Sequence, residues 1–199
     1  MISALTKVEE FAALCEFAVE VGAEYVLMNP LSSFGRGVKS QGRLAADADK
    51  MRAIRAVTMR FREHGLDLVH IRFPNDEQPL AGCDIGKLIY VFADSQLAVC
   101  PYIVFAARTP QSKYPDSDFL VGNIFTDEVA PALDAYDFHH RYAVGANIKC
   151  GSCNMNASCG KGCPAAIIAN GGYIGEVDRE QCPVPDGSQR MLQIGRPRS

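Results

Sequence analysis

The sequence lacks any apolar stretch long enough to cross a bilayer, and it carries no excess of positive charge. Its longest apolar runs, such as Leu88–Phe92 and Ala165–Ala169, fall far short of the roughly 20 residues that a membrane-spanning helix needs. A formal net charge of -3 over 199 residues gives no electrostatic reason to expect nucleic acid or an anionic membrane as a partner. The composition, 48% apolar and 22% charged, predicts a soluble globular protein with neither kind of partner.

The first twenty residues also lack the pattern of an export or transit signal, because acidic side chains are spread through them. We therefore expect a cytoplasmic protein, in which thiols stay reduced. The eight cysteines make up about 4% of the chain, which is below the density of a disulfide scaffold. Cysteines used in this way indicate metal or redox chemistry rather than disulfide bonds.

Residues 1–74 show two helical patterns, each followed by a short apolar strand. Thr6 and Glu9 form a capping-box pattern ahead of the first helix, and Gly22 suits its C-terminal end. The further elements that we predict are a strand over Tyr25–Met28, a loop through Gly35–Gly37, a helix over residues 45–63 and a strand over residues 66–73. This order predicts a right-handed parallel β-α-β unit.

Such a unit is incomplete by itself, because parallel sheets are normally buried on both faces. Two strands cannot meet that requirement, and the chain opens with a helix that has no preceding strand to pack on. We therefore expect residues 1–74 to be the tail of a larger α/β domain. The remainder would come from chain upstream of Met1 or from a partner subunit.

After Pro79 the pattern changes to antiparallel strands and short elements. Strands over residues 88–92 and 96–100 read as a β-hairpin, and residues 108–118 read as a loop. Residues 119–124 follow as a strand, and residues 126–135 as a short helix with Thr126 as its N-cap. Residues 143–182 are rich in Cys, Gly, Asn and Ala, so we expect a bound group to hold this stretch together.

Four cysteines lie within fourteen residues and have the spacing C-x2-C-x5-C-x3-C. They are Cys150, Cys153, Cys159 and Cys163. Short gaps of this kind allow thiolates to converge on one small inorganic centre. Three further cysteines, Cys83, Cys100 and Cys182, lie outside the tract. Prolines directly follow three cysteines of the chain, as in ferredoxin-type sites: Pro101, Pro164 and Pro183.

The spacing leaves three kinds of site open. Zinc is one, although the x5 and x3 gaps differ from the usual paired C-x2-C knuckles. Disulfides are disfavoured by the absence of an export signal, and iron–sulfur ligation is the third and favoured interpretation. Seven cysteines are too many for one site and nearly enough for two sites of four ligands. The eighth, Cys15, lies on the apolar face of the first helix, and we predict a buried core thiol there.

These seven cysteines fit one ordered pattern, C-x9–15-G-x4-C, a gap, C-x2-C-x5-C-x3-C, a gap and a last C. The pattern resembles the SPASM domain, the C-terminal extension of many radical S-adenosylmethionine (SAM) enzymes that modify peptides and proteins. Cys83 and Cys100 correspond to its first pair, and Cys182 to its last cysteine. Two residues depart from the family: Ser95 stands where the motif has glycine, and Lys161 stands in CGKGC where CGGGC is common.

The resemblance implies a domain order and a fold. Residues 1–79 would be the C-terminal part of a radical SAM (β/α) barrel, residues 80–185 a SPASM domain with a β-hairpin and short helices, and residues 186–199 a flexible tail. The fold class is thus α/β in the first part and α+β overall. The chain lacks the C-x3-C-x2-C run that holds the SAM-cleaving cluster in the family. We therefore expect a piece or a split subunit of such an enzyme that is not catalytic alone.

The resemblance also implies ligand sets and cofactors. Cys83, Cys100 and Cys163 would hold a first auxiliary iron–sulfur cluster, and the second would be held by Cys150, Cys153, Cys159 and Cys182. Both would be 4Fe-4S clusters, while SAM and a third 4Fe-4S cluster would belong only to the full-length enzyme. The first cluster would have an open iron, or a fourth ligand from Asp84 or from the substrate.

The expected role of the clusters is electron transfer from an oxidised substrate radical, or substrate anchoring. The enzyme would resemble maturases of ribosomally made peptides or of sulfatases. Its partners would be a peptide or protein substrate and the missing half of the barrel. The alternative is a stand-alone iron–sulfur or zinc module that binds a peptide or partner subunit without catalysis.

Overall fold

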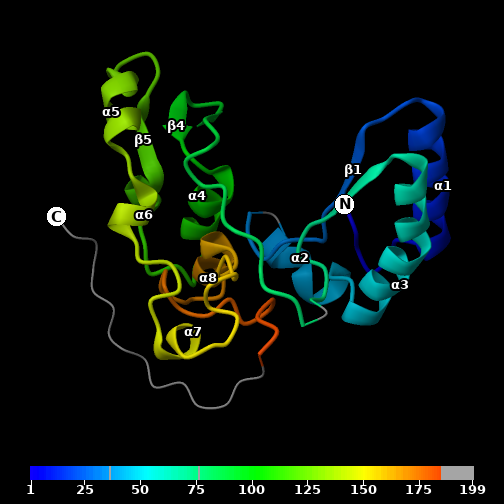
Figure 1. The fold of residues 1–199 in the computed structure, drawn as a ribbon. Coiled ribbons are helices and arrows are strands. Elements are labelled where there is room, and N and C mark those ends of the chain that lie inside the picture. The colour runs from blue at the N-terminus through cyan, green and yellow to red at the C-terminus, as the bar shows by residue number, and fades with distance from the viewer. Residues whose placement is uncertain (36, 76, 185–199) are drawn as a thin grey trace. The chain divides into compact units, whose positions relative to one another are not determined.

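The computed structural model describes residues 1–35, 37–75 and 77–184. In these residues, eight α-helices, two 3-10 segments and five strands in two small sheets form a mixed α/β protein (Figure 1). The chain divides into two compact units, one made of residues 1–32 and 36–76 and the other of residues 33–35 and 77–199. The predicted tail over residues 186–199 lies outside the described residues.

The first unit contains the predicted parallel β-α-β arrangement. Its elements are α1 (Val8–Glu20), β1 (Tyr25–Met28), α2 (Gly37–Leu44), α3 (Ala48–Thr58), η1 (Met59–His64) and β2 (Asp67–His70). Strands β1 and β2 are parallel and in register from the pair Tyr25 and Asp67 to the pair Met28 and His70. The core between the helices and the sheet includes Phe11, Cys15, Met28, Ile54, Phe61 and Leu68.

Helix α1 forms as its apolar periodicity predicts, but its N-terminus differs from the prediction. Lys7 is the N-cap, and its side chain accepts no capping hydrogen bond. The hydroxyl of Thr6 instead accepts a hydrogen bond from the backbone N–H of Ser3 at 2.9 Å. The predicted capping box is therefore wrong, because a turn through residues 3–6 uses the threonine before the helix begins. Cys15 is fully buried in the core, as predicted.

Two helices occupy the region between the strands, where the sequence predicts a loop and one helix. Helix α2 was missed because it is short, contains two glycines, Gly37 and Gly42, and buries none of its described residues. The second predicted helix begins at the N-cap Asp47, whose carboxylate accepts from the N–H of Lys50 at 2.7 Å. Its last turns tighten into η1, and Gly65 ends it with a φ of 79°.

The helices of this unit cover only one face of the two-stranded sheet. Met28 is buried on the helix side, and Val26 packs against the same core. Tyr25 and Leu27 point to the other face and are 60% and 52% exposed. A parallel sheet is thereby left open on the face that has no helices.

The second unit is built from short helices and a three-stranded antiparallel sheet. Its elements are β3 (Tyr90–Val91), β4 (Gln96–Ala98), α4 (Pro101–Ala107), η2 (Asp116–Phe119), β5 (Leu120–Asn123), α5 (Val129–Ala135), α6 (Phe138–Arg141), α7 (Ile148–Gly151) and α8 (Pro164–Ala169). The strand order is β3-β4-β5. The predicted hairpin and the predicted strand over residues 119–124 are present, although all three strands are shorter than predicted.

Helices α4 and α8 form much of the core of the second unit, and neither was predicted. They pack against each other (Figure 1), and all six residues of α8 are buried. Each begins with a proline, which lacks the N–H that the first turn of a helix leaves unbonded. Helix α5 begins at Val129 rather than near Thr126, whose hydroxyl bonds to Asp127 instead of capping. Pro131 is compatible with α5 because it lies in the first turn, where backbone N–H groups have no partner within the helix.

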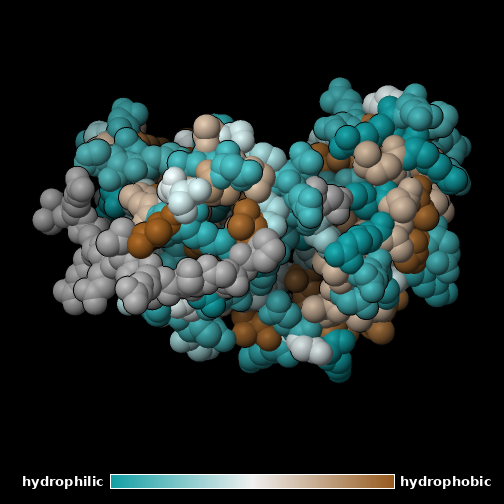
Figure 2. Space-filling view, turned by 60° about the horizontal axis from the view of Figure 1, so that its bottom comes forward, coloured by the Kyte–Doolittle hydropathy of each residue, from teal (hydrophilic) through white to brown (hydrophobic). Residues whose placement is uncertain are grey.

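Apolar side chains interrupt the mainly hydrophilic surface (Figure 2). The longest exposed run in the described residues is Leu88–Val91, at the edge strand β3. No helix in the described parts of the chain is long and apolar enough to cross a membrane.

Candidate iron–sulfur ligand site

Three cysteines that are far apart in the sequence lie near one another in the second unit. Cys100 follows β4 and is the N-cap of α4, while Cys163 is the N-cap of α8. Cys83 lies before the hairpin and packs, with the other two, against the core that α4 and α8 share. All three thiols are half-buried. Packing of the two helices therefore brings Cys100 and Cys163 together at their N-terminal ends.

The pKa shifts of Cys83 and Cys100 also indicate that the three thiols are close to one another. Burial raises the pKa of the Cys83 thiol, the N–H of Ile85 lowers it, and the neighbouring thiols of Cys163 and Cys100 raise it. Burial likewise raises the pKa of Cys100, the backbone amides of Ile103 and Tyr102 lower it, and Cys163 raises it. Several thiolates gathered in a half-buried place repel one another, and a bound cation or cluster removes that cost.

The tract from Cys150 to Cys159 coils through consecutive turns. The N–H of Cys153 donates to the carbonyl of Cys150 at 3.3 Å. The N–H of Cys159 donates to the carbonyl of Met155 at 2.9 Å. Asn147 holds the start of the tract, since its side chain accepts from the N–H of Cys150 and donates to the Cys150 sulfur at 3.3 Å. These turns keep three thiols of the tract on one short segment.

Cys182 joins this tract through the residues around it. Its thiol lies 3.7 Å from the carbonyl of Val184, and the ammonium of Lys149, next to Cys150, donates to the same carbonyl at 2.8 Å. The N–H of Cys182 bonds to the carbonyl of Asp178 at 2.8 Å. The last cysteine and the start of the tract therefore meet at one carbonyl.

The tract also meets the chain that leads into Cys83. The N–H of Gly160 bonds to the carbonyl of Leu80 at 2.7 Å. A Cβ at position 160 would lie 2.3 Å from the backbone of Gly82, so only glycine fits there. The segment after Cys159 and the segment before Cys83 are thus in direct backbone contact.

Ser95 and Lys161 have a left-handed backbone. Their φ angles are 68° and 66°, values that side chains other than glycine seldom adopt. These are the two positions at which the sequence has another residue where the SPASM pattern has glycine. The N–H of Lys161 donates to the Cys159 sulfur at 3.4 Å, and its ammonium contacts the carbonyl and side-chain oxygens of Asn156.

Other candidate ligands are exposed. Asp84, the predicted alternative fourth ligand, pairs with Lys87 at 2.7 Å, and both side chains are largely in solvent. His139 and His140 are exposed on α6. Among the described residues, no three His, Cys, Asp or Glu side chains are arranged to hold a single metal ion. None of the eight cysteines forms a disulfide.

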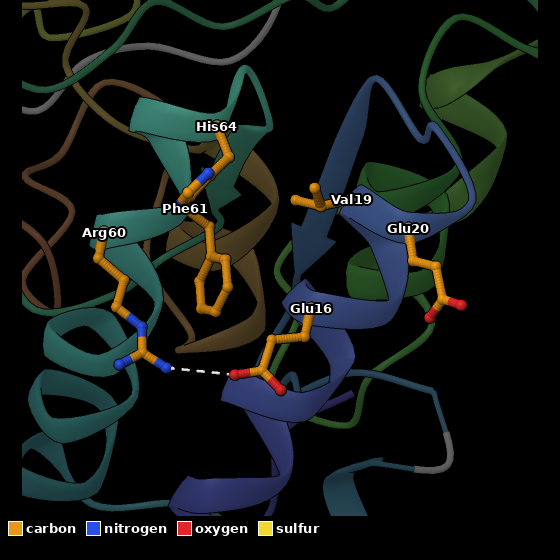
Figure 3. A pocket seen from close by; sticks show the side chains of 6 residues that line it. All are labelled: Glu16, Val19, Glu20, Arg60, Phe61 and His64. Carbon is orange, nitrogen blue, oxygen red and sulfur yellow. Dashed lines mark hydrogen bonds and ion pairs between the residues drawn. The ribbon is translucent and has the colours of Figure 1, made fainter.

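The described residues that line two surface hollows include no cysteine. One, in the first unit, has a volume of about 540 Å³ and lies between α1 and η1. Figure 3 shows the ion pair that joins Arg60 to Glu16 across it, at 3.4 Å. The other, in the second unit, has a volume of about 500 Å³ and is lined in part by Lys113, Asn170 and Asp178.

Comparison with protein-family models, with curated proteins and with solved structures finds no match. The site is therefore characterised by its own geometry. Two features were missed by sequence reasoning: the helix N-caps at Cys100 and Cys163, and the contact of Asp178 with Cys163. A proline directly after each N-cap cysteine was the available signal for the first. No sequence signal indicates the second.

Proposed function

We propose that this chain is the iron–sulfur cluster-binding part of a radical SAM/SPASM enzyme that modifies a peptide or protein. The observation that carries the proposal is the meeting of Cys83, Cys100 and Cys163 from three distant segments. This proximity, together with the contacts between the Cys150 tract and the segment of Cys182, supports the two interleaved ligand sets that the resemblance implies.

The surroundings of the sulfurs fit iron–sulfur clusters. Cys83, Cys100 and Cys159 each receive an N–H from the residue two positions further on, namely Ile85, Tyr102 and Lys161. Hydrogen bonds from N–H groups to cysteine sulfurs, together with burial, are the means by which a protein tunes cluster potentials. The seven predicted ligands are also free and half-buried, so each can be reached by a cluster.

The first unit is proposed to be part of a (β/α) barrel. Its support is the parallel register of β1 and β2 and the helices that cover only one face of them. Tyr25 and Leu27 on the open face are apolar and exposed, as residues that line the inside of an incomplete barrel would be. The remaining strands and the SAM-cleaving cluster would belong to another part of the enzyme.

Bound clusters supply one-electron transfer, and the role proposed for them is to accept an electron from an oxidised substrate radical or to anchor the substrate. The chain's own residues hold and tune these groups. The trio at Cys83 is proposed to bind the first cluster with three protein thiolates. Its fourth position would be open, or taken by Asp84 or by the substrate.

Anaerobic reconstitution with iron and sulfide tests the proposal. We expect a brown protein with about eight irons per chain, which is two clusters of the 4Fe-4S type. Cys83→Ala should lower the iron content and change the spectrum of one cluster. Cys15→Ala is the matched control, because it removes a buried thiol that lies outside both ligand sets.

The outcomes separate the two classes of function. A colourless protein that binds zinc in place of iron would favour the stand-alone zinc module. A brown protein whose iron content is the same in wild type and Cys83→Ala would exclude Cys83 as a ligand and contradict the first ligand set.

A further inference from the structure

Asp178 is a buried acidic residue that contacts one member of each cysteine set. It is only 2% exposed. Its Oδ2 accepts a hydrogen bond from the backbone N–H of Cys163 at 3.1 Å. Its backbone carbonyl accepts from the N–H groups of Cys182 at 2.8 Å and Gln181 at 3.2 Å. Side chain and main chain of one residue are therefore bonded to Cys163 and to Cys182.

The backbone before Cys163 is shaped to admit this carboxylate. Gly162 has a φ of 81°. A Cβ at position 162 would lie 2.6 Å from the Cβ of Asp178 and 2.7 Å from its Oδ2. The Asp178 side chain thus fills the space that any side chain at 162 would need, which requires glycine there on both steric and conformational grounds.

The main-chain bonds form a turn that presents Cys182. Two consecutive N–H groups, those of Gln181 and Cys182, point at the Asp178 carbonyl. The side chain anchors this turn to the start of α8 at Cys163. If the anchor were lost, the turn would keep its internal bonds but would no longer be held beside Cys163.

We infer that Asp178 is a positioning residue that holds one ligand of each proposed cluster in place and lowers the reduction potential of the first. This inference rests on the proposed function, in which Cys163 belongs to the first cluster and Cys182 to the second. A negative charge bonded to a ligand's own amide disfavours the addition of an electron to the cluster. The same residue would then link the assembly of the two clusters.

Two substitutions separate geometry from charge. Asp178→Ala removes the acceptor for the Cys163 amide, and we expect iron of both clusters to be lost to a chelator about 10- to 100-fold more readily, as for other partners behind metal ligands. Asp178→Asn keeps an acceptor oxygen and the shape but removes the charge. We expect it to retain iron and to raise the midpoint potential of the first cluster.

Asp127 offers a control within the same unit, with similar bonding but an exposed side chain. Its Oδ2 also accepts a backbone N–H, from Asn123 at 2.8 Å, and it also lies beside a glycine with positive φ, Gly122. It does not contact the cysteine segments in any bond described above. Asp127→Ala and Asp127→Asn should therefore leave chelator resistance and both potentials unchanged.

The measurements are chelator-challenged iron content, electron paramagnetic resonance of each reduced cluster and redox titration of the full chain. If Asp178→Ala loses only the first cluster, Asp178 does not position Cys182 for the second cluster, and that part of the inference is overturned. Unchanged potentials in Asp178→Asn would overturn the electrostatic role, and this variant decides that role even if Asp178→Ala does not fold. A wild-type chain that binds no iron would instead overturn the proposed function itself.

Discussion

Cys100 and Cys163 occupy equivalent places in the second unit. Each is the N-cap of a helix that begins with proline. The two helices, α4 and α8, pack against each other. The packing brings together two thiols that lie far apart in the sequence. Cys163 thereby lies with Cys100 and Cys83, although in the sequence it belongs to the tract of Cys150.

This placement predicts that Cys163 and Cys153 serve different clusters. After reconstitution, Cys163→Ala should damage the resonance of the first cluster, and Cys153→Ala that of the second. The reason is that Cys163 and Cys100 cap helices that pack against each other, and the Cys163 thiol is near enough to raise the pKa of both Cys83 and Cys100. Cys15→Ala should change neither signal. Identical spectra for the Cys163 and Cys153 variants would point to a single shared site.

Ser95→Gly should stabilise the second unit. Serine at a φ of 68° carries a backbone strain of about 1–2 kcal/mol that glycine does not. Glycine loses more chain entropy on folding, by about 0.5–1 kcal/mol, so the expected net gain is about 0.5–1 kcal/mol in the free energy of unfolding. Denaturant titration measures it.

Ser117→Gly supplies the control for that change. Ser117 lies in η2 and is not among the residues with positive φ. There the entropy cost acts without relief of strain, so the variant should be less stable than wild type. Equal destabilisation by both glycines would show that the left-handed backbone at Ser95 is not strained.

The first unit should lose stability as the pH falls below about 6.5. Burial, with the nearby charges of Arg55 and Arg62, lowers the pKa of His70 from 6.5 to about 4. Between these values the unfolded chain binds a proton that the folded chain does not. The stabilisation from the neutral imidazole is therefore complete above pH 6.5, falls as the pH falls and levels off near pH 4. Because the ring is only half-buried and screened by solvent, we expect a loss of about 1 kcal/mol in the free energy of unfolding.

Urea unfolding at several pH values tests this titration. His70→Gln keeps a polar partner for Thr58, whose hydroxyl lies 3.1 Å from the ring, and it should flatten the profile between pH 4 and 6.5. His139→Gln, at an exposed position, should leave the profile as in wild type. Parallel profiles for wild type and His70→Gln would contradict the assignment.

Lys161→Met should lower the midpoint potential of the proposed second cluster. The ammonium of Lys161 is held near the tract by oxygens of Asn156, and its removal takes a positive charge away from the cluster. Lys113→Met removes a cation that lies over the Tyr173 ring and should not move either potential. Redox titration in which both variants match wild type would rule out tuning by Lys161.

Much of the local structure could be predicted, because it depends on short-range patterns. In the stripe predicted for the second helix, Ile54, Thr58 and Phe61 are buried and Met51 is half-buried. Strands β1 and β2 form within the predicted apolar runs. Helices α2, α4 and α8 were missed. Helix α2 is short and contains two glycines, which are poor helix formers. Helix α8 is buried all round, so it does not show the one-sided periodicity from which helices are recognised.

The sequence by itself determined the order of the parallel unit, the buried place of Cys15 and the spacing of the thiols, since each follows from neighbours along the chain. Only the tertiary structure decided that Cys163 lies with Cys83 and Cys100, because helix packing brings those segments together. It also decided that Asp178 reaches Cys163 and that Ser95 and Lys161 are left-handed. Long-range contacts and positive φ angles at residues other than glycine depend on the whole fold, and the spacing of residues does not encode them.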